Sequence, residues 1–340
     1  MKDDKPQDWL APEPAEFKTK QLSLFTDFLV NSEKEREKLS NIINIWDSMP
    51  KYSVTTKMQN RLRQGGYLPK YERTFNYMGE PYTIEISPAR IGKGKEEKEY
   101  YPSVMEEFVE DALRKLACEP EQLYFSQKRG RVGVKFSLYQ LRKELKERGH
   151  AYTCAEIKTS LDILSQTKIK VEYAEKMIVT SPITNLIGVS EKEIQKNKKA
   201  RWYVEFSIFL SLGLMEKTYR QYNYELMMGL RGQLTRWIYK RLVSRYTQAS
   251  IFLPYDCSLR MIERDSGLLN ASTTPDKKRL LQRSLEELVE KNVLMEFQID
   301  KPERGPKNKI INIGYHLRPT MEFVDEIKRA NKRFAIKDTR

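Results

Sequence analysis

The sequence predicts an α+β protein in which one order of helices and strands occurs twice, after an N-terminal extension with a helix and a β-hairpin. Three observations support this prediction. The 340 residues are enough for two domains of ordinary size. Between Pro102 and Pro319, helical patterns of apolar residues alternate with short runs of β-branched and aromatic residues. Polar helix caps and glycine stops separate these runs in a similar order in both halves.

The N-terminal third has a different texture from the rest. Residues 1–31 contain Pro6, Pro12 and Pro14, which is typical of a flexible arm. From Ser32, apolar residues recur at helical spacing and predict a helix that ends between Asp47 and Pro50. Residues 71–86 predict a β-hairpin with its turn at Gly79-Glu80-Pro81, and the charged residues 90–101 predict a linker.

The first copy of the repeated order starts at Pro102, and its helices have recognisable caps. Ser137 is suited to cap one helix, and Thr153-Cys154-Ala155-Glu156 is a capping box. Its predicted elements are a helix from Pro102 to Cys118, a strand from Val132 to Phe136, a helix from Ser137 to Gly149, a helix opened by Thr153, and strands at Lys168–Tyr173 and Trp202–Phe209.

The second copy has the same order with shorter connections. Thr274 as N-cap and Pro275 at the first helical position mark its last helix. Its predicted elements are a helix from Tyr224 to Arg245, a strand at Ile251–Leu253, a helix from Asp256 or Ser258 to Gly267, the helix opened by Thr274, and strands at Val293–Ile299 and Lys309–His316.

Helix, strand, helix, helix, strand, loop and strand is the order of the winged helix, so we predict two tandem winged-helix domains. The predicted organisation is a flexible arm (1–31), the N-terminal helix, β-hairpin and linker (32–101), a first winged-helix domain (102–215), a second winged-helix domain (216–319) and a C-terminal helix or tail (320–340).

The charge of the chain limits its partners. The 61 Lys and Arg residues outnumber the 47 Asp and Glu residues, and the formal net charge is +14. Such an excess attracts duplex DNA, RNA or an anionic membrane, although a merely soluble basic protein is the alternative. No stretch approaches the roughly 20 apolar residues of a membrane span, and the N-terminus has no secretory signal. Cys118, Cys154 and Cys257 are far apart, which favours a reducing cytoplasm with all three thiols half-buried in packing.

The second copy carries the better candidates for DNA contact. A winged helix lays its last helix in the major groove and its wing against the adjacent backbone. Leu281, Leu285 and Leu288 predict the inward face of that helix, which leaves arginine and glutamine side chains opposite to contact guanine and adenine. The predicted DNA-binding residues are Lys277, Lys278, Arg279, Gln282 and Arg283 in the helix, and Lys301, Arg304, Lys307 and Lys309 in the wing. For either element alone, a solvated surface is the alternative.

The first copy has a nearly neutral recognition helix. Lys158 and Thr159 are its candidate DNA contacts, but phosphate would repel Asp162 on the same face. Its predicted wing is the long segment 174–201, with basic residues at Lys192, Lys196, Lys198, Lys199 and Arg201. A further phosphate-binding candidate is the loop with Lys128, Arg129 and Arg131. We therefore expect weaker DNA binding from this copy, or a role in protein association.

Enzymatic functions have little support in the sequence. Gly92-Lys93-Gly94-Lys95 lacks the spacing and the hydroxyl of a phosphate-binding loop. The two histidines, His150 and His316, are too far apart for the paired-histidine metal centre of rolling-circle nickases. Glu106, Glu107, Glu110 and Asp111 are expected to form a solvated helix face rather than a two-metal site. We expect no catalytic residue, no metal and no cofactor.

A known family shares several of these features. The tandem arrangement, the segment Ile45-Trp46-Asp47-Ser48-Met49-Pro50-Lys51-Tyr52 and the arginine-rich second recognition helix resemble the winged-helix plasmid replication initiators. The resemblance implies a cytoplasmic protein that binds directly repeated origin sites in duplex DNA, mainly through its second domain. It also implies opening of an adjacent AT-rich segment, recruitment of a host initiator and helicase, and a homodimer in exchange with a monomer. The long first wing and the N-terminal third depart from shorter members of the family.

Three alternatives remain open from the sequence. A winged-helix transcriptional regulator is the first, although no segment looks like an apolar ligand pocket. The second is an RNA-binding or single-strand-binding protein, because the hairpin at 71–86 places aromatic residues beside Arg73. A structural adaptor that uses the first domain for protein contacts is the third.

Overall fold

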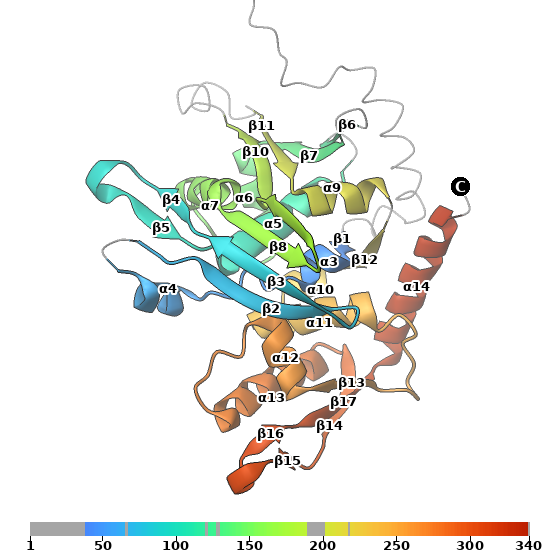
Figure 1. Cartoon of the computed structure of the whole chain (residues 1–340). Coiled ribbons are helices and arrows are strands. Elements are labelled where there is room, and N and C mark those ends of the chain that lie inside the picture. Colours follow the sequence, from blue (N-terminus) through green and yellow to red (C-terminus); the bar gives the residue numbers. More distant parts are fainter. Residues whose placement is uncertain are drawn as a thin grey trace, which may run out of the picture.

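The structure is a computed structural model that describes residues 38–64, 67–119, 122–126, 130–188, 201–216 and 218–338. In Figure 1 the helices and sheets of residues up to about 215 fill the upper part, the elements from about 255 to 319 fill the lower part, and the last helix lies to the right. The predicted N-terminal arm (1–31) lies outside the described residues.

Three helices predicted for the first copy are present, and each begins at a polar cap. Ser103, Ser137 and Thr153 each form a capping box with the Glu or Gln three residues later. Apolar residues on one face of each helix are buried, among them Leu113, Leu141 and Leu161. The helices are α5 (Val104–Leu116), α6 (Leu138–Glu147) and α7 (Cys154–Gln166). With the strand that ends at Phe206, they form what we call the first unit (Val104–Phe206).

The predicted β-hairpin is confirmed, but it does not stand apart from the first unit. Its strands are β2 (Tyr71–Tyr77) and β3 (Glu80–Ser87). Left-handed Met78 and Gly79 form the turn, whereas Glu80 and Pro81 of the predicted turn lie in β3. Strand β3 pairs with β8 (Lys168–Tyr173), which then turns back into β9 (Lys176–Thr180). A four-stranded sheet in the order β2-β3-β8-β9 therefore joins the N-terminal extension to the first unit.

The pairing predicted for the first wing is wrong. Strand β8 does not pair with β11 (Trp202–Phe206), which lies in a second four-stranded sheet with the order β10-β11-β7-β6. The strand ends at Phe206 rather than Phe209 because Ser207 caps helix α9 (Ile208–Met215). The other members of this sheet are β6 (Leu123–Ser126), β7 (Arg131–Phe136) and β10 (Ile183–Ile187).

Two predictions for the N-terminal third are corrected. The run predicted as one helix is a strand, β1 (Leu39–Ile43), followed by the short helix α3 (Asn44–Ser48). Strand β1 pairs with β12 (Tyr219–Asn223). A short buried apolar run can form either a helix or a strand, and here the pairing with β12 makes it a strand. The predicted linker contains a hairpin of two short strands. The remaining elements here are α4 (Thr56–Leu62), β4 (Ala89–Ile91), β5 (Lys98–Tyr100) and a 3₁₀ turn at Gly94–Glu96.

The second copy has the predicted order of elements with local corrections. The predicted strand Lys309–His316 is two strands, Ile310–Asn312 and Gly314–Pro319. The predicted helix from Tyr224 is divided at Gly229–Gly232 into two helices, the strand lies at 255–258 instead of 251–253, and Thr273 rather than Thr274 is the N-cap. The elements are α10 (Tyr224–Met228), α11 (Gln233–Arg245), β13 (Tyr255–Ser258), α12 (Leu259–Ser266), α13 (Thr274–Glu290), β14 (Leu294–Ile299), β15 (Glu303–Arg304), a 3₁₀ turn (Pro306–Asn308), β16 (Ile310–Asn312), β17 (Gly314–Pro319) and α14 (Met321–Asp338).

We call α11 to β17 (Gln233–Pro319) the second unit. Its sheet has the order β13-β17-β14, and the small hairpin β15–β16 extends from it at the bottom of Figure 1. Helix α12 stops at Gly267, whose left-handed conformation (φ +67°) ends the helix. In the second unit, the tip of the β15–β16 hairpin and one face of α13 are exposed to solvent.

The two units meet in a buried cluster of charges, which we call the ionic joint. Helix α5 of the first unit and helix α11 of the second contribute to it, together with the segment after β1. It contains four carboxylates and four cations whose side chains are all buried: Asp47, Glu107, Glu110, Asp111, Lys51, Arg114, Arg236 and Lys240. The prediction that the acidic residues of α5 form a solvated face is therefore wrong. Glu107 and Asp111 pair with α11, Glu110 is bonded by the segment after β1, and Glu106 bonds back to Ser103 at the start of α5.

Specific ion pairs hold the ionic joint together. Arg236 Nη2 lies 3.0 Å from Glu107 Oε2, and Lys240 Nζ lies 2.7 Å from Asp111 Oδ2. Arg114 Nη1 lies 2.7 Å from Asp47 Oδ1. Burial alone raises the pKa of Asp47, but the Arg114 guanidinium outweighs it and holds the pKa at about 2. Asp47 therefore contributes stability that is present above pH 3.8 and lost as the pH falls through about 2.

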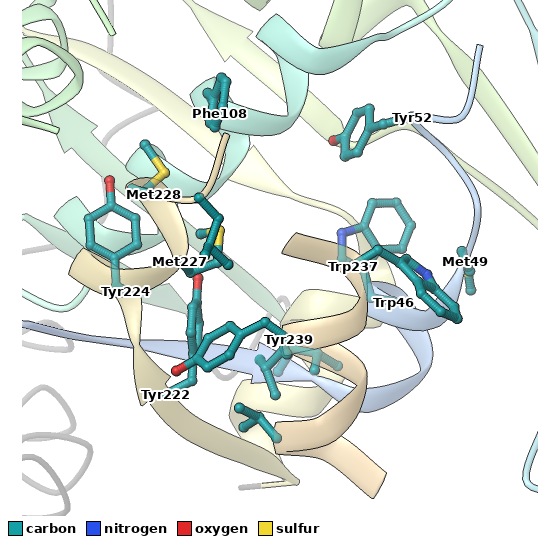
Figure 2. Packing of buried hydrophobic residues seen from close by; sticks show 14 of the residues in the cluster. Trp46, Met49, Tyr52, Phe108, Tyr222, Tyr224, Met227, Met228, Trp237 and Tyr239 are labelled. Carbon is teal, nitrogen blue, oxygen red and sulfur yellow. The ribbon is translucent and has the colours of Figure 1, made fainter. Parts of the chain in front are cut away.

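The segment that carries the family resemblance forms one wall of this joint. Trp46 and Tyr52 both donate hydrogen bonds to the Glu110 carboxylate, and Trp46 stacks on Phe209. Figure 2 shows Trp46 next to Trp237 of α11, with Met49 and Tyr52 close by. Large buried rings and a satisfied carboxylate thus tie the N-terminal segment to both units.

Candidate nucleic-acid interface

Helix α13 has the inward face that its sequence predicts. Leu281, Leu285 and Leu288 are fully buried, and the helix packs on α11, α12 and β14. Thr273 caps its N-terminus by accepting a hydrogen bond from the amide of Asp276. With these leucines turned inward, the opposite face of the helix is available to a ligand.

The basic residues of α13 differ in how far they are engaged within the protein. Lys277 forms an ion pair with Glu263 of α12, and Arg279 Nη2 lies 3.0 Å from Asp276 Oδ1. Arg283 is exposed and Lys278 is partly exposed, and neither has an ion-pair partner among the described residues. The positive charges of Lys278 and Arg283 are thus free to meet an anionic ligand. Gln282 is partly exposed.

The C-terminal half of α13 has the opposite character. It carries Glu286, Glu287 and Glu290. Glu287 accepts hydrogen bonds from the Thr235 hydroxyl and from the amides of Arg231 and Gly232, so it caps the N-terminus of α11. Burial raises the pKa of Glu287, but these hydrogen bonds outweigh it and lower the pKa overall. A polyanion therefore meets a favourable surface only at the N-terminal half of the helix.

The predicted wing is an exposed hairpin, not an open loop. Strand β15 pairs with β16, and Lys307 (φ 56°) and Asn308 (φ 60°) adopt left-handed conformations at the turn. Arg304 Nη1 donates to the carbonyl oxygen of Asn308 at 3.0 Å, which braces the turn. Lys301, Lys307 and Lys309 are exposed and have no ion-pair partner in the described part of the chain. The tip therefore presents lysine charges on a braced backbone.

The described residues of the first unit present fewer free charges than those of the second. Lys158 is half-buried, and the exposed Thr159 hydroxyl donates to the carbonyl oxygen of Ala155 in its own helix. Arg131 forms an ion pair with Glu205 on the neighbouring strand, at 3.2 Å. Lys128 and Arg129 lie outside the described residues, as do Lys192, Lys196, Lys198 and Lys199 of the predicted first wing. Arg201 donates to Gln140.

The aromatic hairpin considered for single-stranded bases uses its side chains in packing. Phe75 is fully buried, and Tyr82 stacks on Tyr173 with ring centroids 4.4 Å apart. Arg73 donates to the carbonyl oxygens of Glu263 at 2.7 Å and Arg264 at 3.4 Å, at the end of α12. This arrangement fastens the hairpin to the second unit and leaves little free ring surface for stacking of bases.

A hollow of about 650 Å³ lies beside the middle and the acidic C-terminal half of α13. The segment 231–235 lines it from the start of α11, Thr55 lines it from the N-terminus of α4, and α13 contributes Leu280, Arg283, Ser284, Glu286, Glu287 and Glu290. No prediction from the sequence included α4 in this surface. The available signal was the absence of any Asp or Glu between Asp47 and Glu72.

Other kinds of site find no support in the described residues. No group of three or more His, Cys, Asp or Glu side chains in that part of the chain is placed to hold a metal ion. None of the described helices is long and apolar enough to span a bilayer. Cys118 and Cys257 are buried free thiols, but Cys154 is exposed, so its predicted packing role is wrong.

Comparisons with known proteins give matches in structure only. No family model matches the chain, and no curated protein matches it in sequence. The chain is similar to domains 2 and 3 of RctB in a structure of selenomethionine derivatives (12% identity, 80% of this chain, 99% of that chain, TM-score 0.47). It is also similar to a second structure of RctB domains 2–3 (12% identity, 76% and 94% coverage, TM-score 0.45). A third similar structure is the Pi initiator protein in complex with iteron DNA (11% identity, 64% and 90% coverage, TM-score 0.41).

Proposed function

We propose that this chain is a sequence-specific, duplex-DNA-binding replication initiator, and that its second unit is a winged-helix domain that recognises the DNA. The observation that carries the proposal is the set of exposed cations on α13 and the wing. Lys278, Arg283, Lys307 and Lys309 have no ion-pair partner among the described residues. Cations left without internal partners on two neighbouring elements suit a polyanion.

In this proposal, α13 enters the major groove with its N-terminal half. Arg283 has the planar guanidinium that binds guanine in a bidentate manner, and Gln282 suits adenine. Arg279 has the same capacity once it exchanges its exposed ion pair with Asp276, which costs little because exposed pairs contribute less than about 1 kcal/mol. Lys278 and the wing lysines contact phosphates, so they contribute to affinity more than to sequence preference.

The more specific role follows the family resemblance of the sequence. We propose that the chain acts in the cytoplasm, binds directly repeated origin sites of a plasmid-type replicon, helps to open the DNA and recruits host replication proteins. The first unit, proposed as a second and less basic winged-helix domain, serves assembly and auxiliary DNA contact, including a homodimer in exchange with monomer. We further propose that the chain has no enzymatic activity of its own and needs no metal or cofactor.

Binding measurements on nucleic acids of defined form test this proposal. Cognate duplexes are selected from a random-sequence pool by the full chain, and fluorescence anisotropy then compares duplex DNA, single-stranded DNA and RNA of the same sequence. We expect duplex to bind at least tenfold more tightly. Arg279→Ala and Arg283→Ala should each cost about 1–3 kcal/mol on the cognate duplex and relax base preference at one position.

Two outcomes would count against the proposal. Equal binding of single strands and duplex would favour a single-strand-binding or RNA-binding protein. Unchanged cognate affinity in both arginine variants would show that α13 is not the recognition helix. A transcriptional regulator is distinguished by genetic context, because an initiator should have directly repeated sites, about two helical turns apart, next to its gene.

A further inference from the structure

The short helix α4 lies in a long stretch of the chain without negative charge, and its N-terminus borders the same hollow as α13. Between Asp47 and Glu72 there is no acidic residue, whereas Lys51, Lys57, Arg61, Arg63 and Lys70 are basic. Lys51 is buried in the ionic joint, but the others lie at or near the surface. The uneven charge therefore belongs to the surface formed by α4 and its flanks.

Helix α4 is held firmly in place. Gln59 is buried and exchanges two hydrogen bonds with the backbone of Tyr101, its Nε2 donating at 3.0 Å and its Oε1 accepting at 3.2 Å. The Thr55 hydroxyl accepts from the amide of Met58 and caps the helix. Arg63 closes the other end, with its guanidinium 5.3 Å from the centre of the Tyr100 ring. A helix anchored on its inner side and at both ends presents its outer face in one orientation.

The outer face of α4 is polar and basic. Lys57, Asn60 and Arg61 are exposed, and their spacing places them on one side of the helix, opposite buried Gln59. Lys57 and Arg61 have no ion-pair partner among the described residues. No large apolar side chain is exposed on this helix. The face therefore has the composition of a polyanion contact rather than of a protein interface core.

The position of α4 links it to the recognition surface of the second unit. Thr55 at its N-terminus lines the same hollow as Arg283 of α13, and Glu286 and Glu290 of α13 line that hollow as well. Asn270, in the loop before α13, donates to the carbonyl oxygen of Ser53 at 3.3 Å, and Gln233 of α11 donates to that of Tyr52 at 2.9 Å. In Figure 1, α4 lies directly above the loop that leads into α13, on the left side of the molecule.

We propose that the α4 face (Lys57, Asn60 and Arg61) binds the sugar–phosphate backbone of the duplex next to the segment that α13 recognises. This inference rests on the proposed function, because it extends the DNA path from the second unit onto the N-terminal extension. Lysine and arginine bind phosphates and release condensed counterions, and asparagine is a common additional donor to phosphate. The contact carries no base specificity and lengthens the bound site.

The test uses the full chain with Lys57→Ala/Arg61→Ala, and Lys328→Ala/Lys332→Ala as the matched control. Both pairs are exposed lysine or arginine residues one helical turn apart, and α14 lies on the other side of the molecule. Affinity is measured against salt concentration on the selected duplex with flanks of about one and a half helical turns, and on a duplex trimmed to the core. Thermal unfolding should be unchanged in both variants, since the residues are exposed.

We expect Lys57→Ala/Arg61→Ala to lose affinity for the flanked duplex only. Two lost phosphate contacts should reduce the slope of log K against log salt by about 2 and lower the affinity about 10- to 60-fold at 0.1 M salt. The loss should be equal for flanks of any sequence, and absent on the trimmed duplex and in the control. If α4 and α14 variants behave alike while Arg283→Ala still weakens binding, the α4 contact is wrong and the proposed function stands.

Cross-linking gives an independent readout of the same contact. Asn60→Cys in a Cys154→Ser background carries a photoreactive group, and the two remaining cysteines are buried. We expect cross-links to flanking nucleotides on the selected duplex, and none from Lys328→Cys in the same background. Cross-links from neither position, with full binding, overturn the α4 contact. Absence of duplex binding by the unmodified chain overturns both the contact and the proposed function.

Discussion

Helices α7 and α13 hold the same place in the two units, yet they present different surfaces. Each is the third helix of its unit and each has a buried leucine face. Helix α13 is basic at its N-terminal half, where Arg283 has no described partner. Helix α7 presents Ala155 and Thr159 with half-buried Asp162, and it packs between β4 and β10. The same helix with a buried leucine face therefore presents a basic surface in the second unit and packs against two strands in the first.

The strands that follow these helices explain the difference. After α13, strand β14 pairs with β17 and the wing projects freely. After α7, strand β8 pairs with β9 of its own unit on one edge and with β3 of the N-terminal hairpin on the other. Because β8 also pairs with a strand from outside its unit, it belongs to a sheet that the first unit shares with the N-terminal hairpin. This comparison indicates that the first unit is built into the assembly of the chain, while the second remains open to a ligand.

The largest effect should come from breaking the ionic joint that connects the two units. Lys240→Met leaves Asp111 and Glu107 with less compensation in a buried site, and such changes cost about 3–5 kcal/mol. Urea unfolding should show this loss of free energy of unfolding. Lys328→Met, an exposed control on α14, should change it by less than about 0.5 kcal/mol. A similar small change in both variants would show that the charges of the joint are not coupled.

The second-largest effect should be on duplex affinity, and it compares a residue of α13 with one of α7. Arg283→Ala should lower the affinity for the selected duplex by about 1–3 kcal/mol, since a bidentate base contact is lost. Thr159→Ala should leave it almost unchanged, because the threonine hydroxyl is bonded to its own helix. Anisotropy titrations at one salt concentration give both values. If Thr159→Ala costs as much as Arg283→Ala, the first unit contacts bases too and the division between the units is wrong.

The wing should give a smaller and less specific effect. Lys307→Ala removes one exposed charge from the tip, so the slope of log K against log salt should fall by about 0.9 and all sequences should weaken alike. Lys176→Ala, at the exposed start of β9 in the first unit, is the control. A change in base preference in Lys307→Ala would place this residue in a groove rather than on the backbone.

The smallest effect should be the difference in pKa between the two histidines, one in each unit. Burial lowers the pKa of His150, which stacks on Phe108, below its ordinary value of 6.5. Hydrogen bonds with Asp256 and Asp300, at 2.6 and 3.1 Å, raise the pKa of His316 above 6.5. NMR titration of the two imidazoles should show this order, with His150→Gln and His316→Gln for assignment. The reverse order would contradict both environments.

These shifts have opposite consequences for stability. The folded protein binds the His316 proton more tightly than the unfolded chain does, so this stabilisation is full below pH 6.5 and is lost as the pH rises through the folded pKa. The unfolded chain binds the His150 proton more tightly, so stability falls as the pH drops below 6.5. The difference in free energy of unfolding between each glutamine variant and the parent should follow these directions.

Sequence patterns predicted the elements whose signals are local. The caps at Ser137, Thr153 and Ser258 and the stop at Gly267 mark helix ends within a few residues, so α6, α7, α12 and α13 are placed closely. Strand β1 was missed because its partner β12 is far away in the chain and has no apolar alternation of its own. The basic face of α4 was not predicted from the sequence. A basic residue can bind a ligand only if it is exposed, and exposure depends on tertiary packing.

By itself, the sequence determined the order of helices and strands in the second unit, the inward leucines of α13 and the basic character of its outer face. These features depend on periodicity and capping, which act over one or two helical turns. Only the tertiary structure decided which charges remain available. It buried Glu107 and Asp111 against Arg236 and Lys240, paired Lys277 with Glu263, and left Arg283 without an ion-pair partner among the described residues. The physical reason is that desolvation and ion pairing depend on neighbours in space, and residues far apart in the chain supply those neighbours.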